Sequence, residues 1–126
     1  MTTINLSGVI PPVTTPFDER GDIQYDSVKA QVDWLVDCGV SGIAVGGSTG
    51  EGHALEADEF RTLIETALEA ADGRIDVIAG IITDSTRESV RRGQIIRDSG
   101  VVALQVTPVH YVFKPTDDGT VEHFRT

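Results

Sequence analysis

Residues 42–55, read Gly-Ile-Ala-Val-Gly-Gly-Ser-Thr-Gly-Glu-Gly-His-Ala-Leu, have the types and spacing best suited to chemistry. The stretch begins as a short apolar run, typical of a strand buried on both faces of a parallel sheet, and then changes to glycines and hydroxyls. The glycines permit positive φ and let a ligand approach the backbone closely. The adjacent hydroxyls of Ser48 and Thr49, beside N–H groups that a tight turn leaves unpaired, suit an anion such as a carboxylate or a phosphate.

A simpler interpretation of the same loop is that Ser48 and Thr49 cap the helix that follows. The loop does not fit the Gly-x-Gly-x-x-Gly fingerprint of dinucleotide-binding proteins, and it lacks the lysine of a P-loop. The residues alone therefore leave two hypotheses open, an anion-binding loop and a helix cap.

The composition indicates one globular domain in a reducing compartment. The chain has 126 residues, of which 40% are hydrophobic, enough for one core but without an apolar run that could span a membrane. No secretory signal opens the sequence, so we expect a cytoplasmic protein. The single cysteine, Cys38, excludes an internal disulfide. Its place just before Gly39, late in a predicted helix, favours a small packing residue over a nucleophile.

The formal net charge of −10 argues against nucleic acid and anionic membranes as partners. Such a surface also repels anionic substrates at long range, so an anion site must be built from local N–H groups and hydroxyls. His53 and His123 have no partners at metal-ligand spacing, and we expect no zinc or iron site. The pair Asp117-Asp118 indicates a helix start and not the carboxylates of a glycosidase.

The chain repeats a pattern of helix, glycine, short apolar strand and polar loop. The pattern predicts strands at residues 8–17, 40–45, 75–82 and 101–106, with helices at 23–38, 56–71, 84–98 and from 117 onward. Prolines make the first strand short, so that it leaves the sheet around residues 14–16. Ser85 and Glu88 are placed for a capping box at the third helix. Repeating βα units of this size form an open doubly wound sheet or a (β/α)₈ barrel.

Four ordered motifs resemble one family. They are residues 45–51 (VGGSTGE), residues 13–18 (VTTPFD), residues 77–80 (VIAG), and residues 106–108 (VTP) followed by Tyr111. Together they resemble the dihydrodipicolinate synthase and N-acetylneuraminate lyase family, from residue 8 to the last residue. The resemblance implies a (β/α)₈ barrel, usually tetrameric, without metal or organic cofactor. It also implies aldol-type condensation or cleavage of pyruvate, or another 2-oxo acid, with an aldehyde, through a Schiff base on a lysine.

The resemblance also implies roles for the loop residues. Thr49 and Ser48, with the backbone N–H groups around Gly47 and Gly50, would hold the carboxylate of the 2-oxo acid. Ser48 would pass protons between tyrosines, and a serine at this position is more like the sialic acid lyase branch. Fixing the carboxylate aims the ketone carbon at an amine, while a hydroxyl serves the proton steps of imine formation. Glu51 is expected to orient the loop through hydrogen bonds.

Two neighbouring residues, Tyr111 and His110, are candidates for the partner of Ser48 in that proton relay. Tyr111, with Phe113 two residues later, matches the lyase-like pattern and is the preferred relay or inter-subunit tyrosine. In the synthase branch the tyrosine follows the Thr-Pro pair by two positions, where this chain has His110. The alternative for both residues is loop packing at an oligomer interface.

Length is the main departure from the family. A barrel needs roughly 250 residues, so residues 1–126 are predicted to form one partial domain: the N-terminal half, with about four βα units and a truncated last helix. The Schiff-base lysine and a second tyrosine of the family would follow residue 126, and neither Lys29 nor Lys114 matches that lysine. We therefore do not expect these residues to be active by themselves. The alternative is a non-catalytic half-barrel that binds a small carboxylate or pairs with another chain. A third hypothesis, half of a phosphate-binding barrel isomerase, is supported by the glycine loop alone.

Overall fold

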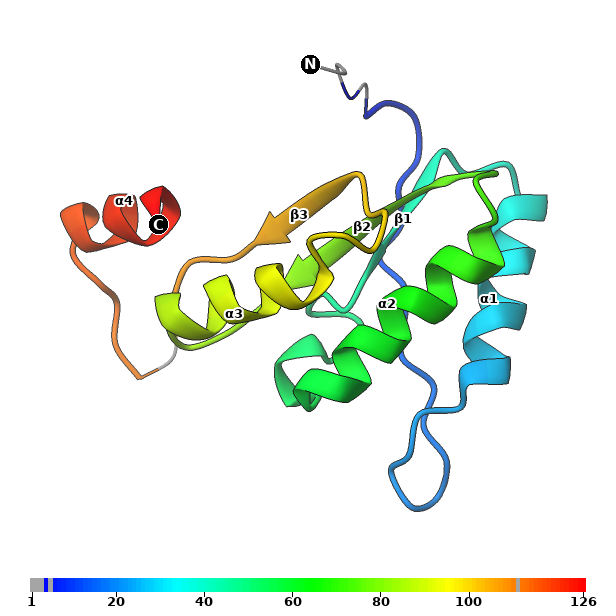
Figure 1. Cartoon of the computed structure of the whole chain (residues 1–126), viewed down its shortest axis with the longest axis horizontal. Helices are drawn as coiled ribbons and strands as arrows, with labels where there is room; N and C mark the ends of the chain where they lie inside the picture. Colours follow the sequence, from blue (N-terminus) through cyan, green and yellow to red (C-terminus); the bar gives the residue numbers. More distant parts are fainter. Residues whose placement is uncertain (1–3, 5, 111) are drawn as a thin grey trace.

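The described part of the chain forms a three-stranded parallel sheet with helices packed along it (Figure 1). The computed structural model describes residue 4, residues 6–110 and residues 112–126. The elements in chain order are α1 (Tyr25–Asp37), β1 (Gly42–Val45), η1 (Gly52–Ala54), α2 (Ala57–Ala71), β2 (Asp76–Ile81), α3 (Thr86–Ile96), β3 (Ala103–Val106) and α4 (Asp117–Arg125). This α/β order, with strands β1-β2-β3 side by side, confirms the predicted βα repeat.

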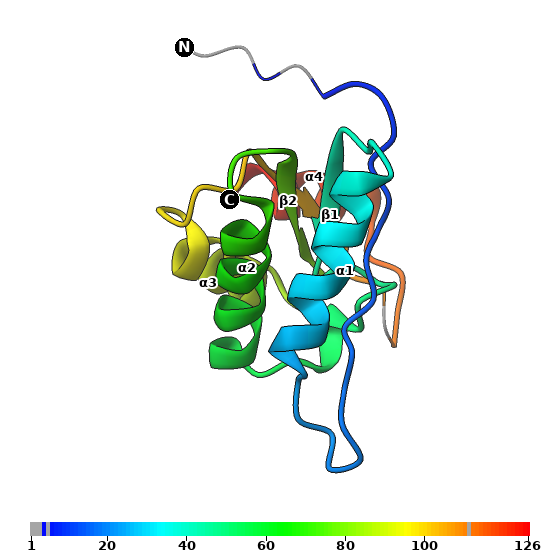
Figure 2. The ribbon, with the colours of Figure 1, turned by 90° about the vertical axis from the view of Figure 1, so that its right-hand side faces the viewer.

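One face of the sheet is buried under α1, α2 and α3 (Figure 1, Figure 2). Alternate residues of each strand point to this face, as the twofold period of a strand requires. In register, Ile43 lies opposite Val77, and Ala79 opposite Leu104. The fully buried large side chains of the core are Phe60, Ile43, Leu63, Ile64, Ile81, Ile96, Val28, Val32, Val45 and Val77.

Helix α2 shows why the chain folds as its pattern predicts. Its apolar stripe, which includes Phe60, Leu63 and Ile64, is buried against the sheet and α1. Glu56 lies just outside the helix as the N-cap, and the capping box is formed by Glu56 with Glu59, whose carboxylate accepts from the Glu56 N–H at 2.9 Å. The predicted start at residue 56 is thus one residue early.

The predicted first strand, residues 8–17, is wrong. This segment lies beside β1 but makes one isolated parallel bridge, between Pro12 and Ala44. Val13 N–H donates to Ala44 O at 3.0 Å, and Ala44 N–H donates to Pro11 O at 3.0 Å. Pro11 and Pro12 have no N–H to continue a regular ladder, and the one further bond runs from Ser41 N–H to Val9 O at 2.9 Å. The described residues therefore contain three strands instead of four.

Two smaller expectations also need correction. Ser85 does cap α3, accepting from Glu88 N–H at 3.2 Å, but the Glu88 carboxylate lies beside Arg91 and Arg92 instead of completing a capping box. Cys38 is exposed at the C-cap of α1, so its interpretation as a packing residue is wrong. The apolar stripe of α1 ends before Cys38, and the chain turns away at Gly39 with φ +78°.

Helix α4 begins at Asp117, as predicted, and lies beyond the carboxyl end of β3 (Figure 1). Thr116 caps it by accepting from Gly119 N–H at 3.2 Å. His123 connects the helix to the rest of the chain, since its Nδ1 lies 2.8 Å from Thr86 Oγ1 and its Nε2 lies 3.2 Å from Thr107 O.

The second face of the sheet borders a cavity. Here Ala44, Ile78 and Ala103 form a row across the three strands and line a cavity of about 360 Å³, together with Leu6, Ile10, Leu104 and Gln105. None of the residues that line this cavity belongs to a described helix. Within the described residues, no helix is long and apolar enough to cross a membrane.

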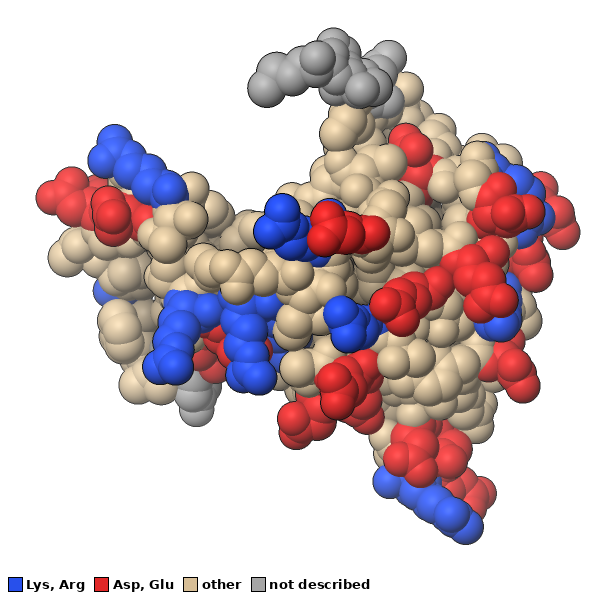
Figure 3. Space-filling view, in the orientation of Figure 1, with Lys and Arg blue, Asp and Glu red and all other residues tan. Residues whose placement is uncertain are grey.

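Charge is unevenly distributed over the helical face (Figure 3). Acidic side chains are spread over α1 and α2, whereas basic side chains gather over α3, which carries the exposed Arg87 and Arg91. The helices that cover the core thus differ in the sign of their outer surface.

Candidate functional site

The glycine-rich loop follows β1 at the carboxyl ends of the parallel strands. It is a tight turn, because the N–H groups of Gly50 and Gly52 both donate to Gly47 O at 3.1 Å. Ser48 and Thr49 are exposed at its tip. Among the described residues, neither the Ser48 N–H nor the Thr49 N–H has a hydrogen-bond acceptor. Two adjacent unpaired donors beside two hydroxyls form an arrangement that can receive an anion.

Close backbone contacts require glycine at two positions of the turn. Gly46 has φ +71°, and a Cβ there would lie 2.9 Å from Cε2 of Phe60. A Cβ on Gly52 would come within 1.8 Å of Gly46 O, so the turn folds directly back onto its first residue. A larger residue at either place would move Ser48 and Thr49.

The turn is also anchored from the N-terminal segment. The buried Thr15 donates from Oγ1 to Gly50 O at 2.6 Å. Thr15 lies in one of the four sequence motifs, but the sequence alone predicted no role for it. A Thr-Thr-Pro run beside a predicted sheet was the available signal, because a buried hydroxyl needs a partner.

Helix capping by Ser48 and Thr49 is wrong. The N-cap of α2 is Glu56, and that of η1 is Glu51, which has φ 54°. Glu51 shapes the turn through its left-handed backbone, with its N–H donating to Ser48 O at 3.1 Å and its carbonyl accepting from Ala54 N–H at 2.9 Å. In the described part of the chain its side chain makes no hydrogen bond, so the expected role of that carboxylate in orienting the loop is not seen.

The ends of β1, β2 and β3 converge on one cavity of about 500 Å³. Its lining comes from the loops after all three strands: Ser48, His53, Ile82, Asp84 and His110. The structure thus brings together Ser48 and His110, which sequence reasoning proposed for related roles. Tyr111, the preferred relay residue, lies outside the described residues and stays a prediction. No group of three or more His, Cys, Asp or Glu in the described ranges is placed to hold a metal ion.

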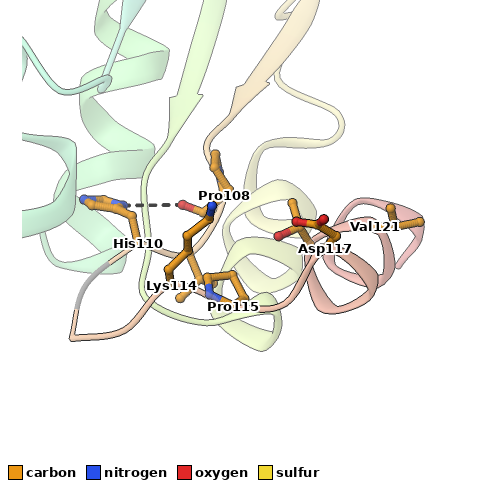
Figure 4. A pocket seen from close by; sticks show the side chains of 8 residues that line it. Pro108, His110, Lys114, Pro115, Asp117 and Val121 are labelled. Carbon is orange, nitrogen blue, oxygen red and sulfur yellow. Dashed lines mark hydrogen bonds between the residues drawn. The ribbon is translucent and has the colours of Figure 1, made fainter.

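His110 also lines a neighbouring cavity of about 640 Å³ (Figure 4). This cavity lies between the loop after β3 and α4, and His110 Nδ1 lies 3.4 Å from Pro108 O. Lys114 lines this cavity and not the one beside Ser48. Lys29 lies on α1, where its Nζ pairs with Glu69 at 3.1 Å. Neither lysine is therefore placed at the Ser48 cavity.

Sequence reasoning missed Arg92. This residue is buried on the inner face of α3, three residues after Ser89 and four before Ile96, which are also buried. A helical period that places an arginine among core positions was the signal, because a buried guanidinium must have acceptors nearby. Arg92 finds them in the segment that follows the glycine turn.

Comparison with known proteins tests the family that the sequence motifs resemble. The model of the dihydrodipicolinate synthetase family matches residues 5–126. The chain belongs to this family. Relatives include 4-hydroxy-tetrahydrodipicolinate synthase of Methanococcus aeolicus, 38% identical over 120 residues, and that of Escherichia coli, 40% identical over 120 residues. The alignments cover 94% of this chain, and 41% and 40% of those two relatives.

Solved structures of the dihydrodipicolinate synthetase family have the same fold. A chloride-inhibited dihydrodipicolinate synthase from Acinetobacter baumannii, complexed with pyruvate, superimposes with a TM-score of 0.91 at 30% identity, covering 96% of this chain and 41% of that one. Ruminococcus gnavus sialic acid aldolase gives a TM-score of 0.86 at 26% identity, covering 94% and 39%. The chain thus spans about two fifths of these proteins, and the predicted N-terminal half-barrel is confirmed.

Proposed function

We propose that this chain carries the carboxylate-binding half of a pyruvate-dependent Schiff-base lyase. The observation that carries the proposal is that the Ser48 and Thr49 N–H groups, presented at the carboxyl ends of the strands, have no acceptor within the described residues. In a barrel of this kind the active site is built from the loops at that end. Pyruvate, or another 2-oxo acid, and an aldehyde are the proposed substrates, with no metal or organic cofactor.

The loop acts by orientation. The carboxylate of the 2-oxo acid accepts hydrogen bonds from the backbone around Gly47 to Gly50 and from the hydroxyl of Thr49, which leaves the ketone carbon facing the cavity. Neutral donors suit this task, because the net charge of −10 gives no long-range attraction for an anion. Holding the ketone in one orientation lowers the entropic part of the barrier to attack by an amine.

Ser48 is the proposed proton relay, since it lines the cavity that the ketone would face. An amine adds to the ketone carbon to give a carbinolamine. The hydroxyl group of the carbinolamine then receives a proton and leaves as water, which gives the Schiff base. A hydroxyl can accept and return that proton in consecutive steps. Tyr111 is the proposed partner in this exchange, with His110 as the alternative because it lines the same cavity as Ser48.

The amine is proposed to come from outside residues 1–126. Lys29 is paired with Glu69 on the helical side of the sheet, and Lys114 lines a different cavity. We further propose that the enzyme works in the cytoplasm as a homo-oligomer. One observation favours a second candidate, a non-catalytic half-barrel that binds a small carboxylate or pairs with another chain: within the described residues no lysine lines the Ser48 cavity.

Borohydride trapping with pyruvate separates the two candidates. The 126-residue chain and the product of its complete reading frame are each incubated with pyruvate, reduced and weighed by intact mass spectrometry, with Lys114→Met as the control. An adduct on the complete product alone supports the proposal. An adduct on the short chain that disappears in Lys114→Met contradicts our assignment of the amine. A folded complete product without an adduct favours the non-catalytic binding module.

A further inference from the structure

Arg92 is a charged side chain buried between α3 and the segment that follows the glycine turn. Its exposed fraction is 6%. Arginine is seldom buried to this extent unless its N–H groups have acceptors and its charge has a partner. The shortest contacts of Arg92 are its hydrogen bonds to backbone carbonyls.

The guanidinium of Arg92 holds both ends of the short helix η1. Its Nη1 donates to Gly52 O at 2.5 Å, and its Nη2 donates to Leu55 O at 2.7 Å. These carbonyls stand at the first residue of η1 and just after its last residue. A planar guanidinium can serve two separate acceptors in a fixed geometry, which a single ammonium on a flexible stem cannot match.

The same guanidinium also supports the start of the turn. Its Cζ lies 5.2 Å from the centroid of the Phe60 ring, within the range of a cation–π contact. The edge of that ring closes against Gly46, where a Cβ would be 2.9 Å from Cε2. Arg92 thus supports the first residue of the turn, Gly46, through Phe60. It supports the other end of the turn through the hydrogen bonds to Gly52 O and Leu55 O. Ser48 and Thr49 lie between these two supports.

A carboxylate lies beside the buried guanidinium of Arg92. Glu88, one helical turn earlier, places Oε1 3.5 Å from Nε, although among the described residues Nε has no hydrogen-bond partner. This carboxylate offsets part of the positive charge of the buried guanidinium. Arg92 therefore contributes to the geometry of the turn, through its two carbonyl acceptors and the ring of Phe60.

We propose that Arg92 is a positioning residue for the carboxylate site. By fixing Gly52, Leu55 and the ring of Phe60, it sets the Ser48 and Thr49 N–H groups in the geometry that receives a 2-oxo acid. It acts through the loop and does not touch the substrate. This inference rests on the proposed function, since the ligand named here is the carboxylate of that reaction.

The test compares Arg92→Met, Arg92→Lys and the control Arg91→Met in the product of the complete reading frame. Arg91 is exposed on the same helix and also pairs with Glu88, with Nη1 3.7 Å from Oε2. We expect Arg92→Met to raise the KM for pyruvate by about 10-fold or more, with the KM for the aldehyde changed by less than about 2-fold. Arg92→Lys should recover part of this loss, and Arg91→Met should behave as wild type.

Hydrogen exchange of residues 46–55, followed by mass spectrometry, tests the same inference without turnover. Exchange there should be about 10-fold faster in Arg92→Met than in Arg91→Met. Should Arg92→Met not fold, Arg92→Lys is read in its place against the same control. Unchanged pyruvate KM with unchanged exchange, or an equal rise of both KM values, would overturn the inference. A wild-type protein that forms no pyruvate adduct overturns the proposed function and the ligand named here, whereas faster exchange in the variant still upholds the positioning of the loop.

Discussion

Gly80 on β2 lies directly against Gly47 in the turn after β1. A Cβ built on Gly80 would come within 2.5 Å of both the Cα and the N of Gly47. The two backbones touch because β2 runs in register beside β1 and the turn folds over its carboxyl end. The position of the proposed carboxylate site therefore depends on the absence of a side chain on the neighbouring strand.

Gly80→Ala should destabilise the full chain and displace the turn. The added methyl meets backbone atoms, which cannot rotate away, and we expect a loss of about 3 kcal/mol in the free energy of unfolding. Urea denaturation followed by circular dichroism measures it. The control is Gly93→Ala on α3, where a Cβ would meet only side-chain carbons of Leu104 and Ile81 at 3.6 and 3.8 Å. A Gly80→Ala protein as stable as wild type would contradict the contact.

Thr15→Val tests the anchor on Gly50. The substitution keeps the shape of the side chain but leaves Gly50 O without its 2.6 Å hydrogen bond, at an expected cost of about 1–2 kcal/mol. Thr66→Val is the matched control: Thr66 is also buried, but its Oγ1 donates at 2.7 Å to Thr62 O, a carbonyl within α2. Denaturation midpoints should therefore fall further for Thr15→Val. Equal losses in the two variants would argue against a special role of Thr15.

Ser48→Ala tests the proposed relay. Loss of the hydroxyl should slow formation of the pyruvate adduct in the complete product by about 100-fold, because the proton steps lose their carrier. The backbone N–H of residue 48 remains, so we expect the KM for pyruvate to change little. Rapid quenching with borohydride gives the rate, and Ser7→Ala, in the exposed N-terminal segment, is the control. A normal rate in Ser48→Ala would remove this residue from the mechanism.

Ionisation of Tyr25 should lower the free energy of unfolding at alkaline pH. Burial of its ring raises the pKa above the ordinary value of 10.0, Glu59 adds to the rise, and a hydrogen bond with Thr62 opposes it. The folded state then keeps a proton that the unfolded chain gives up. This contribution is complete below pH 10.0 and is lost as the pH rises through the pKa of the folded protein. Urea titrations between about pH 9 and 11 should show a smaller fall for Tyr25→Phe than for wild type.

The order of the helices and strands after residue 22 could be predicted because it follows from local pattern. The apolar stripe of α2 and the apolar run of β2 gave elements within one residue of those observed. The glycine turn was likewise visible, since glycines and hydroxyls directly after a buried strand are typical of a tight turn with free N–H groups. Its occupant stays a prediction, as does the role of Tyr111.

The anchors of the turn could not be predicted, because each joins residues far apart in sequence. Thr15 reaches Gly50 across 35 positions, and Arg92 reaches Gly52 across 40. Nothing in a local window indicates which carbonyl a buried donor will meet. The prediction of a first strand was wrong for a different reason. The apolar residues of this segment fit a strand, but Pro11 and Pro12 cannot donate to a ladder.

These prolines give the sheet two unlike edges. On the β1 side, the segment that holds Pro11 and Pro12 covers the edge, and its missing N–H groups discourage a further strand from pairing there. On the other side, β3 pairs with β2 and is the last strand of the described sheet. The two edges therefore differ in the backbone donors that they offer to a further strand. A closed barrel must pair both edges, so a strand that meets Pro11 and Pro12 has fewer backbone donors to bond with than a strand that joins β3.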